Sequence, residues 1–393
     1  MQEDLSYVMV TPHTVAKSRT GGVLSRLLSR TNLELVGTQI FAPSDDFAYE
    51  YASTLRRRAP QNQLMLLADY MENVVAPNGG RPHRTLLLLF KGVNPCDQLL
   101  EACGHIFTQN VTVDALLGET IRDTYADIIY SKDNPEEIYY FEPAVLTPRL
   151  QNDANNDLQM IAHYLEGKEN IVQNISYLDT TKIEQSLVII KPDNWHFGSG
   201  RPGSIMDMFS RTGMRVVATK LFRFSLNQAL EFYGSVRGNL MKRLSPAFGK
   251  KAREVLEREF EIALDDRIEA ILTDSFGREY AKEEFYKLVE FMSGSSPDTC
   301  PVEKRNIPGD VKCMINLYEG ENAIQKIRDV LGPTDPLQAP VGTVRREFGS
   351  SVMVNTAHAS DSVENSIREQ EIVKINENSL VSIINEHFSG SRN

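Results

Sequence analysis

The sequence of 393 residues is too long for one hydrophobic core of ordinary size, so two or three domains are expected. Its formal net charge of -11 argues against non-specific binding to nucleic acid or to an acidic membrane, but a local cluster of cations could still bind a nucleotide. The 4 cysteines form no CxxC pair and no metal-binding spacing with histidine, which indicates buried or free thiols in a reducing compartment.

The first residues and the apolar runs indicate where in the cell the protein is expected. Residues 1–4 carry acidic side chains and lack the apolar core of a signal peptide. The longest apolar run, residues 86–90, is far too short to cross a bilayer. We therefore expect a cytoplasmic protein that does not contact membranes.

In chain order, the first elements alternate between strands and helices. Residues 7–10 have the pattern of a short buried strand. After Gly21 and Gly22, apolar residues recur at helical spacing, and residues 33–40 then alternate as a second strand. Ser44 begins another helix, because serine is a favoured N-cap residue.

The same order returns in the second half of the chain. Residues 187–190 have a strand pattern that ends at Lys191. Apolar residues at helical spacing around Ile205 follow, residues 214–221 alternate as a strand, and Ser225 begins a helix. Two copies of one βαββαα-type unit are therefore predicted.

Individual residues of the two copies correspond. Ser44 corresponds to Ser225, and further along the chain Thr120 corresponds to Thr343. The larger separation of the second pair means that the second copy carries about forty extra residues. A charged helical stretch and a loop rich in serine and proline account for part of this excess.

This repeat predicts three segments. The first domain comprises residues 1–150, a helical linker comprises residues 151–183, and the second domain comprises residues 184–393. Insertions in the second domain are expected near residues 235–275 and 295–312.

His358 is the strongest candidate for a reactive side chain. It follows a β-type run at residues 351–354, so it is expected to emerge from the end of a strand. Ser360 and Asp361 offer an N-cap or turn for a helix in residues 362–369. Histidine can be a neutral nucleophile near pH 7, although a solitary histidine is more often structural.

Cations in the second copy suit a polyphosphate ligand. Lys191 follows a strand, Arg328 lies in a helical run, and Arg345 comes after a glycine-containing turn. Arginine offers a planar fork to phosphate oxygens, and lysine offers a compact charge. Thr334 and Asn355 could donate further hydrogen bonds.

Other signals narrow the kind of site. The aromatic residues that could stack on a base are Tyr233, Phe285 and Tyr286, although helical aromatics are more often part of a core. The sequence has no GxxxxGK[ST] loop and no GxGxxG run, so a glycine-rich phosphate cradle is not expected. No cluster of residues has metal-ligand spacing, and no protein metal site is predicted.

The first copy lacks the candidate reactive residues. At the spacing of the threonine pair, His358 corresponds to Pro135, and at the strand end Lys191 corresponds to Thr11. Whatever chemistry the second copy performs, the first copy is expected to have lost it.

Several motifs resemble one known family. The run from Asn355 to Glu364, Asn-Thr-Ala-His-Ala-Ser-Asp-Ser-Val-Glu, is similar to the active-site signature of nucleoside diphosphate kinases. Lys191-Pro-Asp resembles the end of their first strand, and Gly332-Pro-Thr-Asp-Pro with the later Gly342-Thr-Val-Arg resembles their loop and the arginine after it. The resemblance covers about residues 185–375, with the motifs in the order of the family. The first copy resembles the family only weakly.

The resemblance implies a fold and a mechanism. The fold would be α/β, with two ferredoxin-like α/β sandwich domains whose sheets are antiparallel. The activity would be ping-pong transfer of a γ-phosphoryl group from a nucleoside triphosphate to a nucleoside diphosphate through a phosphohistidine. Mg²⁺ would be held mostly by the phosphates of the nucleotide.

The resemblance also implies residue roles. His358 would be the nucleophile, Glu369 would orient its imidazole, and Asn355 would contact the ribose and phosphate end. The residues that would hold the phosphates are Lys191, Arg328, Thr334 and Arg345. The residues that would lie by the phosphates or the base are Tyr233, Phe285 and Leu288.

Two hypotheses follow. The first is a tandem nucleoside diphosphate kinase with one active site per chain, in the second copy, whose first copy fills the pairing surface of a missing subunit. It would associate further as a dimer or trimer of chains. The alternative is a catalytically weak or inactive nucleotide-binding or assembly module with the same fold, because Ala359 replaces the family's glycine and an insertion falls in the region of its nucleotide lid.

Overall fold

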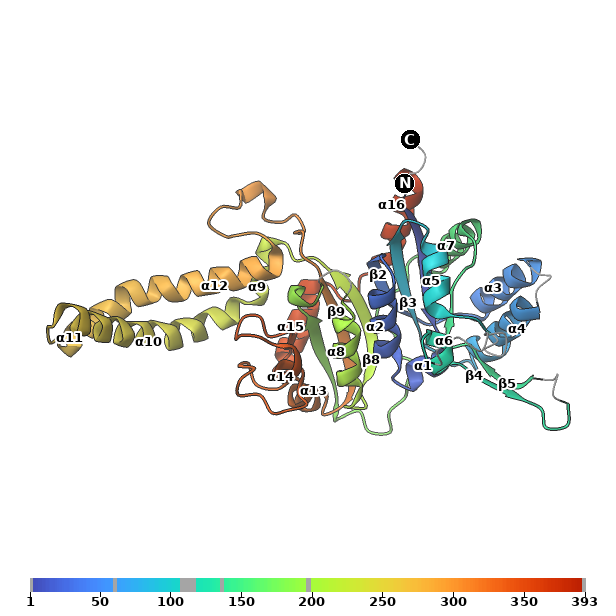
Figure 1. Ribbon diagram of the computed structural model, residues 1–393, viewed down its shortest axis with the longest axis horizontal. Coiled ribbons are helices and arrows are strands. Elements are labelled where there is room, and N and C mark those ends of the chain that lie inside the picture. Colours follow the sequence, from blue (N-terminus) through green and yellow to red (C-terminus); the bar gives the residue numbers. More distant parts are fainter. Residues whose placement is uncertain (1–2, 59–61, 107–117, 135–137, 196–198, 391–393) are drawn as a thin grey trace. The chain divides into compact units, whose positions relative to one another are not determined.

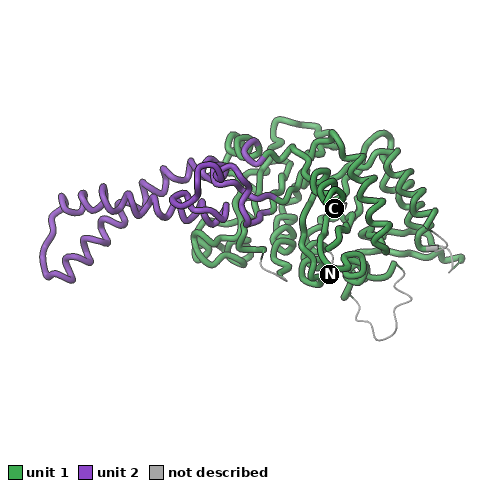
Figure 2. The backbone as a smooth tube through the Cα atoms, turned by 90° about the horizontal axis from the view of Figure 1, so that it is seen from above, with its two compact units in different colours: residues 1–221, 314–370, 374–393 green, residues 222–313, 371–373 purple. Residues whose placement is uncertain are grey.

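The chain forms two compact units. The computed structural model describes residues 3–58, 62–106, 118–134, 138–195 and 199–390 (Figure 1). Unit 1 comprises residues 1–221, 314–370 and 374–393, and unit 2 comprises residues 222–313 and 371–373 (Figure 2). Two four-stranded sheets are built almost entirely from unit 1, and unit 2 is mostly helical.

The first four-stranded sheet is antiparallel and has the strand order β2-β3-β1-β6. Its strands are β1 (Asp4–Val10), β2 (Glu34–Phe41), β3 (Thr85–Gly92) and β6 (Val145–Leu146). Alternate residues of β3 pack into different core clusters, so both faces of this strand are covered. This double burial explains the apolar run of residues 86–90.

Helices cover both faces of this sheet. Helices α2 and α5 pack into one cluster, and α3, α4 and α7 pack into the other. The helices of this half are α1 (Pro12–Ala16), α2 (Thr20–Arg30), α3 (Asp45–Arg58), α4 (Asn62–Tyr70), the π-helix η1 (Met71–Val75), α5 (Pro95–Cys103), α6 (Ile121–Tyr125) and α7 (Gln151–Leu165). A hairpin of β4 (Asp127–Tyr130) and β5 (Ile138–Glu142) precedes β6.

The second four-stranded sheet has the order β10-β7-β9-β8. Its strands are β7 (Ile183–Ile190), β8 (Arg215–Phe222), β9 (Cys313–Glu321) and β10 (Ala357–Ala359). The helices around it are the 3-10 helix η3 (Pro192–Asn194), α8 (Arg201–Ser210), α13 (Ala323–Leu331), α14 (Val344–Phe348) and α15 (Val363–Val373), and the last helix of the chain is α16 (Leu380–Gly390).

Both sheets follow one plan. In each, the first strand lies between the third and the fourth, and the second strand lies beside the third. This order, with a helix after the first and third strands, is that of the ferredoxin-like sandwich. The predicted α/β fold with antiparallel sheets is therefore confirmed in both halves of the chain.

Unit 2 contains six helices of the described residues. They are α9 (Leu226–Phe232), α10 (Gly234–Phe260), α11 (Asp266–Leu272), the π-helix η4 (Thr273–Gly277), α12 (Arg278–Ser293) and the 3-10 helix η5 (Val302–Lys304). Ser225 caps α9 as predicted, and its hydroxyl accepts a hydrogen bond from the Gln228 amide. At Gly277 a Cβ atom would lie 2.5 Å from the Ser245 carbonyl oxygen, so η4 packs directly on α10. Helices α10 and α12 therefore form a folded helical hairpin.

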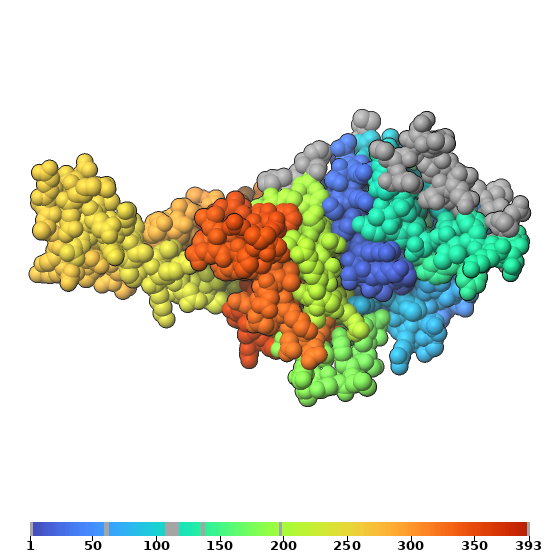
Figure 3. Space-filling model, turned by 60° about the horizontal axis from the view of Figure 1, so that its bottom comes forward, coloured from blue at the N-terminus to red at the C-terminus, as the bar shows by residue number. Residues whose placement is uncertain are grey.

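Unit 1 is held together by a close contact between α2 and α8. A Cβ atom on Gly203 would lie 2.2 Å from the Ser25 nitrogen and 2.4 Å from the Gly21 carbonyl oxygen. A Cβ atom on Gly21 would lie 2.4 Å from the Asp207 nitrogen. Only glycine at both positions lets the two backbones approach so closely. The surface shows the same seam, where blue residues of the first half meet lime residues near position 200 (Figure 3).

The two halves meet through corresponding residues of β2 and β8 and through one shared apolar core. Thr38 of β2 and Thr219 of β8 hydrogen-bond to each other through their hydroxyl groups, 3.0 Å apart. One buried apolar cluster extends from Leu24 of α2 to Phe209 of α8 and onto both sheets. Because residues of both sandwiches form this cluster, water is excluded from a single core that the two sandwiches share.

Some local predictions differ from the structure. Residues 351–354 form no strand, because the Ser350 and Ser351 amides both donate to the Val354 carbonyl and close a turn. The helix after His358 is capped by Ser362, whose hydroxyl accepts from the Asn365 amide, and not by Ser360 or Asp361.

The predicted linker and the C-terminal end also contribute to the first half. Residues 151–165 form the single helix α7, and its Leu158 and Ile161 belong to the core under the first sheet. Helix α16 packs against α7 and β2, and its Leu380 and Ile384 enter the same core. The chain thus returns to the first sheet after completing the second.

The close contact at Gly203 predicts that a methyl group added there will strongly lower the stability of the protein. Gly203→Ala should lower the free energy of unfolding by about 1–3 kcal/mol, because the neighbouring atoms are backbone and cannot move aside. Urea denaturation followed by circular dichroism measures this change. Gly238→Ala in α10 is the matched control, since its Cβ atom meets nothing within 4 Å. Equal stability of Gly203→Ala and wild type would contradict the tight contact.

Candidate active site

His358 lies within the edge strand of the second sheet. It is the middle residue of β10 and pairs with Ile189 of β7. The strand begins after Thr356, which has a φ angle of 76°, a left-handed conformation that a non-glycine residue seldom adopts. The Lys191 amide donates to the Thr356 carbonyl at 2.9 Å, so this strained residue is tied to the end of β7.

One carboxylate holds the imidazole ring. His358 Nε2 lies 2.9 Å from Glu369 Oε1, and the two side chains are 21% and 4% exposed. The Ser360 hydroxyl donates to the other carboxylate oxygen, Oε2, at 2.6 Å. Glu369 comes from α15 and Ser360 from the end of β10, so helix and strand together fix the ring orientation.

A second set of contacts joins Lys191 to the segment before His358. Lys191 Nζ donates to Asn355 Oδ1 at 2.6 Å, and both residues are buried. The Asn355 amide nitrogen donates to the Thr334 carbonyl at 3.1 Å and to the Val352 carbonyl at 2.9 Å. Residues from three distant parts of the sequence therefore meet at one place.

The two arginines differ in exposure. Arg345 is partly buried and donates through Nη1 to the Gly332 carbonyl at 2.9 Å and through Nη2 to the Ala357 carbonyl at 3.1 Å. Arg328 is exposed near the end of α13, four residues before the same Gly332. The side chain of Thr334 is exposed as well.

The three remaining expected residues belong to unit 2. Tyr233 ends α9, is 4% exposed and packs against Phe232 with ring centroids 5.0 Å apart. Phe285 of α12 is 2% exposed, and the Arg237 guanidinium lies 5.9 Å from its ring centroid. Leu288 is partly buried on the same helix. The seven other candidates belong to unit 1, and these three belong to the helical unit.

Sequence reasoning missed two polar residues of this cluster. Asn194 is fully buried, and its side-chain amide donates to the Thr356 carbonyl at 2.8 Å and to the Lys191 carbonyl at 3.1 Å. Ser360 was expected to offer an N-cap or a turn, and its hydroxyl donates to the Glu369 carboxylate instead of capping the helix. For Asn194, the only available signal was its position in the turn after Lys191.

No metal centre is found in the part of the chain that the structure describes. There, no group of three or more His, Cys, Asp or Glu side chains could hold a metal ion. Within the same residues, no helix is long and apolar enough to cross a membrane.

The first half has the same framework at the equivalent place. Arg122 donates to the Gly104 carbonyl and, at 3.0 Å, to the Val145 carbonyl, as Arg345 does to Gly332 and Ala357. The Thr11 amide donates to Ala144, a left-handed residue with φ of 62°, as Lys191 does to Thr356. The ends of β1 and α5 in the first half therefore correspond to the ends of β7 and α13 in the second half.

This correspondence corrects the expected partner of His358. Val145 pairs with Val10 and Ala357 pairs with Ile190, so the next residue, Leu146, occupies the place of His358. Pro135, the partner expected from sequence spacing, lies outside the described residues. Residue counting gave the wrong partner because the β4–β5 hairpin lies between α6 and β6 in the first half, and no such hairpin lies between α14 and β10 in the second half.

The other charged positions have also changed. Leu100 is the sixth residue of α5, where Arg328 is the sixth residue of α13. Ile106 follows Gly104 at the distance at which Thr334 follows Gly332, and both glycines have φ near 82°. Among the cationic positions, the first half keeps only the arginine at 122.

Comparison with known proteins gives a consistent relationship. The family model described as nucleoside diphosphate kinase matches residues 268–378. The nucleoside diphosphate kinase of Chlamydia muridarum is 30% identical over 183 residues, which are 47% of this chain and 86% of that protein. The enzyme of Staphylothermus marinus is 29% identical over 190 residues, which are 48% of this chain and 92% of that protein.

Solved structures match over a similar share of the chain. The nucleoside diphosphate kinase of Aquifex aeolicus is 27% identical, with 49% of this chain and 94% of that chain covered and a TM-score of 0.30. The NDP kinase of Pyrobaculum aerophilum is 26% identical, with 50% and 100% covered and a TM-score of 0.34. On the identity and coverage of the sequence relatives, this chain belongs to the nucleoside diphosphate kinase family.

Proposed function

We propose that the chain is an active nucleoside diphosphate kinase with one catalytic site, formed around His358 in the second half. The observation that carries this proposal is the hydrogen bond between His358 Nε2 and the buried Glu369 carboxylate, beside Lys191, Asn355 and Arg345. A buried carboxylate that orients a partly exposed imidazole is an arrangement for a nucleophile and its positioning group.

The hydrogen bond to Glu369 selects the attacking nitrogen. With a proton on Nε2, the ring donates to Glu369 Oε1, and the lone pair then belongs to Nδ1. Nδ1 attacks the γ-phosphorus of the nucleoside triphosphate as the bond to the bridging β–γ oxygen breaks, and the diphosphate leaves. A β-phosphate oxygen of a second nucleoside diphosphate then attacks the phosphohistidine, and Nδ1 is released.

The cations neutralise the charge of the transferring group. Phosphoryl transfer passes through a loose transition state that requires positioning and charge stabilisation more than covalent machinery. We assign this role to Lys191, Arg328 and Arg345, with Thr334 as a further donor. Asn355 holds Lys191 Nζ and contacts the ribose and phosphate end. The nucleotide phosphates would hold Mg²⁺, which would supply further charge neutralisation when bound.

The base contacts assigned to unit 2 belong to the same proposal. Tyr233, Phe285 and Leu288 would lie by the phosphates and the base of the nucleotide. Apolar contacts of this kind tolerate different bases, and nucleoside triphosphates and diphosphates in general are therefore the proposed substrates.

Ala359 does not obstruct this chemistry. It replaces the glycine of the family, but it lies in β10 in ordinary strand conformation. Its methyl group packs into the apolar cluster shared by the two halves. Successive strand residues point to opposite faces, so this methyl group points away from the imidazole.

We further propose that the first half is a degenerate copy that serves as a built-in partner. The α2–α8 contact joins it to the second half, and Leu146, Leu100 and Thr11 replace the reactive and cationic residues. Further association into a dimer or trimer of chains stays a prediction.

The nucleophile is tested by His358→Gln. Transfer of the γ-phosphate from ATP to another nucleoside diphosphate should fall by on the order of 10⁴-fold. Wild type treated with labelled ATP should carry an acid-labile, base-stable phosphate only in the peptide that contains His358. His163→Gln, on the exposed side of α7, is the control. Transfer that survives in His358→Gln would refute the assignment, and folded wild type that binds ATP without transfer would indicate the binding module.

The positioning role of Glu369 is tested by Glu369→Gln. We expect kcat to fall by about a hundredfold because the ring loses its fixed orientation, while the Kd for ATP stays unchanged. Glu364→Gln on the exposed face of the same helix should leave both constants unchanged. Stopped-flow kinetics and calorimetry provide the two values. A weaker Kd with normal kcat would assign Glu369 to substrate binding instead.

The phosphate contact of Arg328 is tested by exchanging it for the residue of the first half. Arg328→Leu should raise the KM for nucleoside triphosphate by about tenfold, the effect of losing one charged phosphate contact. Stability should change by less than about 0.5 kcal/mol, because the side chain is exposed. Lys326→Leu, exposed on the same helix, is the matched control. An unchanged KM would remove Arg328 from the site.

A further inference from the structure

Helix α10 of the helical hairpin has one covered face and one exposed face. Its covered face packs on α12, which runs beside it (Figure 1). Ser245 and Gly249 are buried on that face, and the Phe248 ring packs against Tyr280 with ring centroids 5.2 Å apart. The opposite face carries charged side chains that are open to solvent.

The exposed face of α10 is one continuous row of residues. The row consists of Arg243, Ala247, Lys250, Glu254, Glu257 and Glu261. Its spacing alternates between four and three residues, which keeps the row on one side of a helix and is the spacing of the contact positions in a coiled coil. All of them are exposed except Glu257, which is partly buried. The row is therefore a surface that a second helix can contact along its length.

The charges along α10 are separated by sign. Residues 234–253 contain six basic residues and no acidic residue, whereas residues 254–261 contain four acidic residues and one basic residue. This order opposes the helix dipole, which favours acidic residues in the first turn and basic residues in the last turn. The stability of α10 alone therefore does not account for the order of its charges.

Several of these charges have no counterpart in their own chain. Among the described residues, Arg243, Lys250 and Glu261 are exposed and take part in no ion pair. Arg243 and Glu261 are about 27 Å apart along the helix, so they cannot reach each other within one chain. Lys251 lies 3.7 Å from Glu254, with side chains 73% and 52% exposed, and a pair so exposed contributes little.

A second copy of α10 complements this order when it runs antiparallel to the first. If Arg243 lies opposite Glu261 of the other copy, the same register places Lys250 opposite Glu254. A two-fold axis relates the two helices, so each pair of charges occurs twice. The helix dipoles also oppose each other in this arrangement, and each basic half meets an acidic half.

Exposed apolar side chains at the end of α10 are covered in the same register. Phe260 and Ile262 are 64% and 49% exposed. They would lie beside residues 242–244 of the second copy, where the aliphatic parts of lysine and arginine can cover apolar surface while their charged ends stay in water. Charge and apolar cover therefore favour the same arrangement.

We propose that two copies of this chain associate through antiparallel α10 helices, with Arg243 of each copy opposite Glu261 of the other. Helix α10 has 27 residues and is about 40 Å long, and a hairpin of two helices is about 20 Å wide. A face of this size offers about 800 Å² per copy, which is the area of a standard protein interface. The proposal does not depend on catalysis at His358.

The test exchanges two charges that can meet only between copies. Sedimentation equilibrium of the full-length chain measures the Kd of the dimer. Arg243→Glu should raise this Kd by about a hundredfold, because the contact is lost twice and becomes repulsive. The double variant Arg243→Glu with Glu261→Arg should return the Kd to within about threefold of wild type, because it restores both pairs with their charges exchanged.

Controls separate this contact from net charge and from folding. Arg81→Glu changes the net charge by the same amount at an exposed position of the first half, and it should leave the Kd unchanged. Circular dichroism should show equal helix content in all variants, since Arg243 and Glu261 are exposed. Added salt should weaken the wild-type dimer, because it screens the ion pairs.

Three results would overturn the proposal. Wild type that stays monomeric at about 0.1 mM would show that this face binds no second copy, since interfaces of the proposed area have micromolar or tighter affinity. A folded Arg243→Glu variant that dimerises like wild type would place the contact on another surface. A double variant that stays as weak as Arg243→Glu would exclude the pairing of Arg243 with Glu261.

Discussion

The structure of unit 1 depends on the contact of two helix backbones at Gly21 and Gly203. A side chain on either glycine would overlap backbone atoms of the facing helix, so the contact exists only without one. This approach merges the cores of two sandwiches into one apolar cluster. Because the two halves share one buried cluster, each is held in register with the other.

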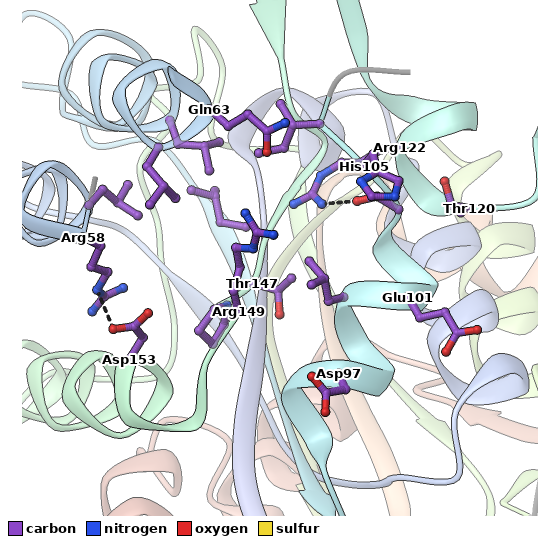
Figure 4. A pocket seen from close by; sticks show the side chains of 18 of the residues that line it. Arg58, Gln63, Asp97, Glu101, His105, Thr120, Arg122, Thr147, Arg149 and Asp153 are labelled. Atoms are coloured by element: carbon purple, nitrogen blue, oxygen red, sulfur yellow. Dashed lines mark hydrogen bonds and ion pairs between the residues drawn. The ribbon is translucent and has the colours of Figure 1, made fainter. Parts of the chain in front are cut away.

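Within this rigid framework the two sites have different chemistry. Arg122 and Arg345 hold the same pair of backbone carbonyls in their respective halves, so the arginine is needed for the fold itself. The residues at the surrounding positions differ between the two halves, although the strands pair in the same way. In the second half they carry a histidine with a buried carboxylate partner, and in the first half they carry leucine and isoleucine around a hollow. One scaffold therefore holds a histidine–carboxylate pair in one half and a hollow in the other (Figure 4).

Much of this organisation could be predicted from local pattern. Alternation, helical spacing and the serine caps identify the strands and helices of both halves, because side-chain burial imposes those periods on the sequence. The cluster of His358, Glu369, Lys191 and Asn355 could be assigned because these residues occur in motifs of one family. Residues 351–354 were mistaken for a strand, since a short apolar run cannot reveal that serine amides close it into a turn.

The sequence by itself determined the class of fold, the repeated order of strands and helices and the motif that contains His358, since each depends on local spacing or a contiguous run of residues. Only the tertiary structure decided which residues face each other. It replaced Pro135 by Leu146 as the counterpart of His358, because strand register and not residue counting sets that match. It also showed that Ser360 supports Glu369 and that α16 returns to the first sheet. Such pairings join residues distant along the chain, and no local pattern encodes them.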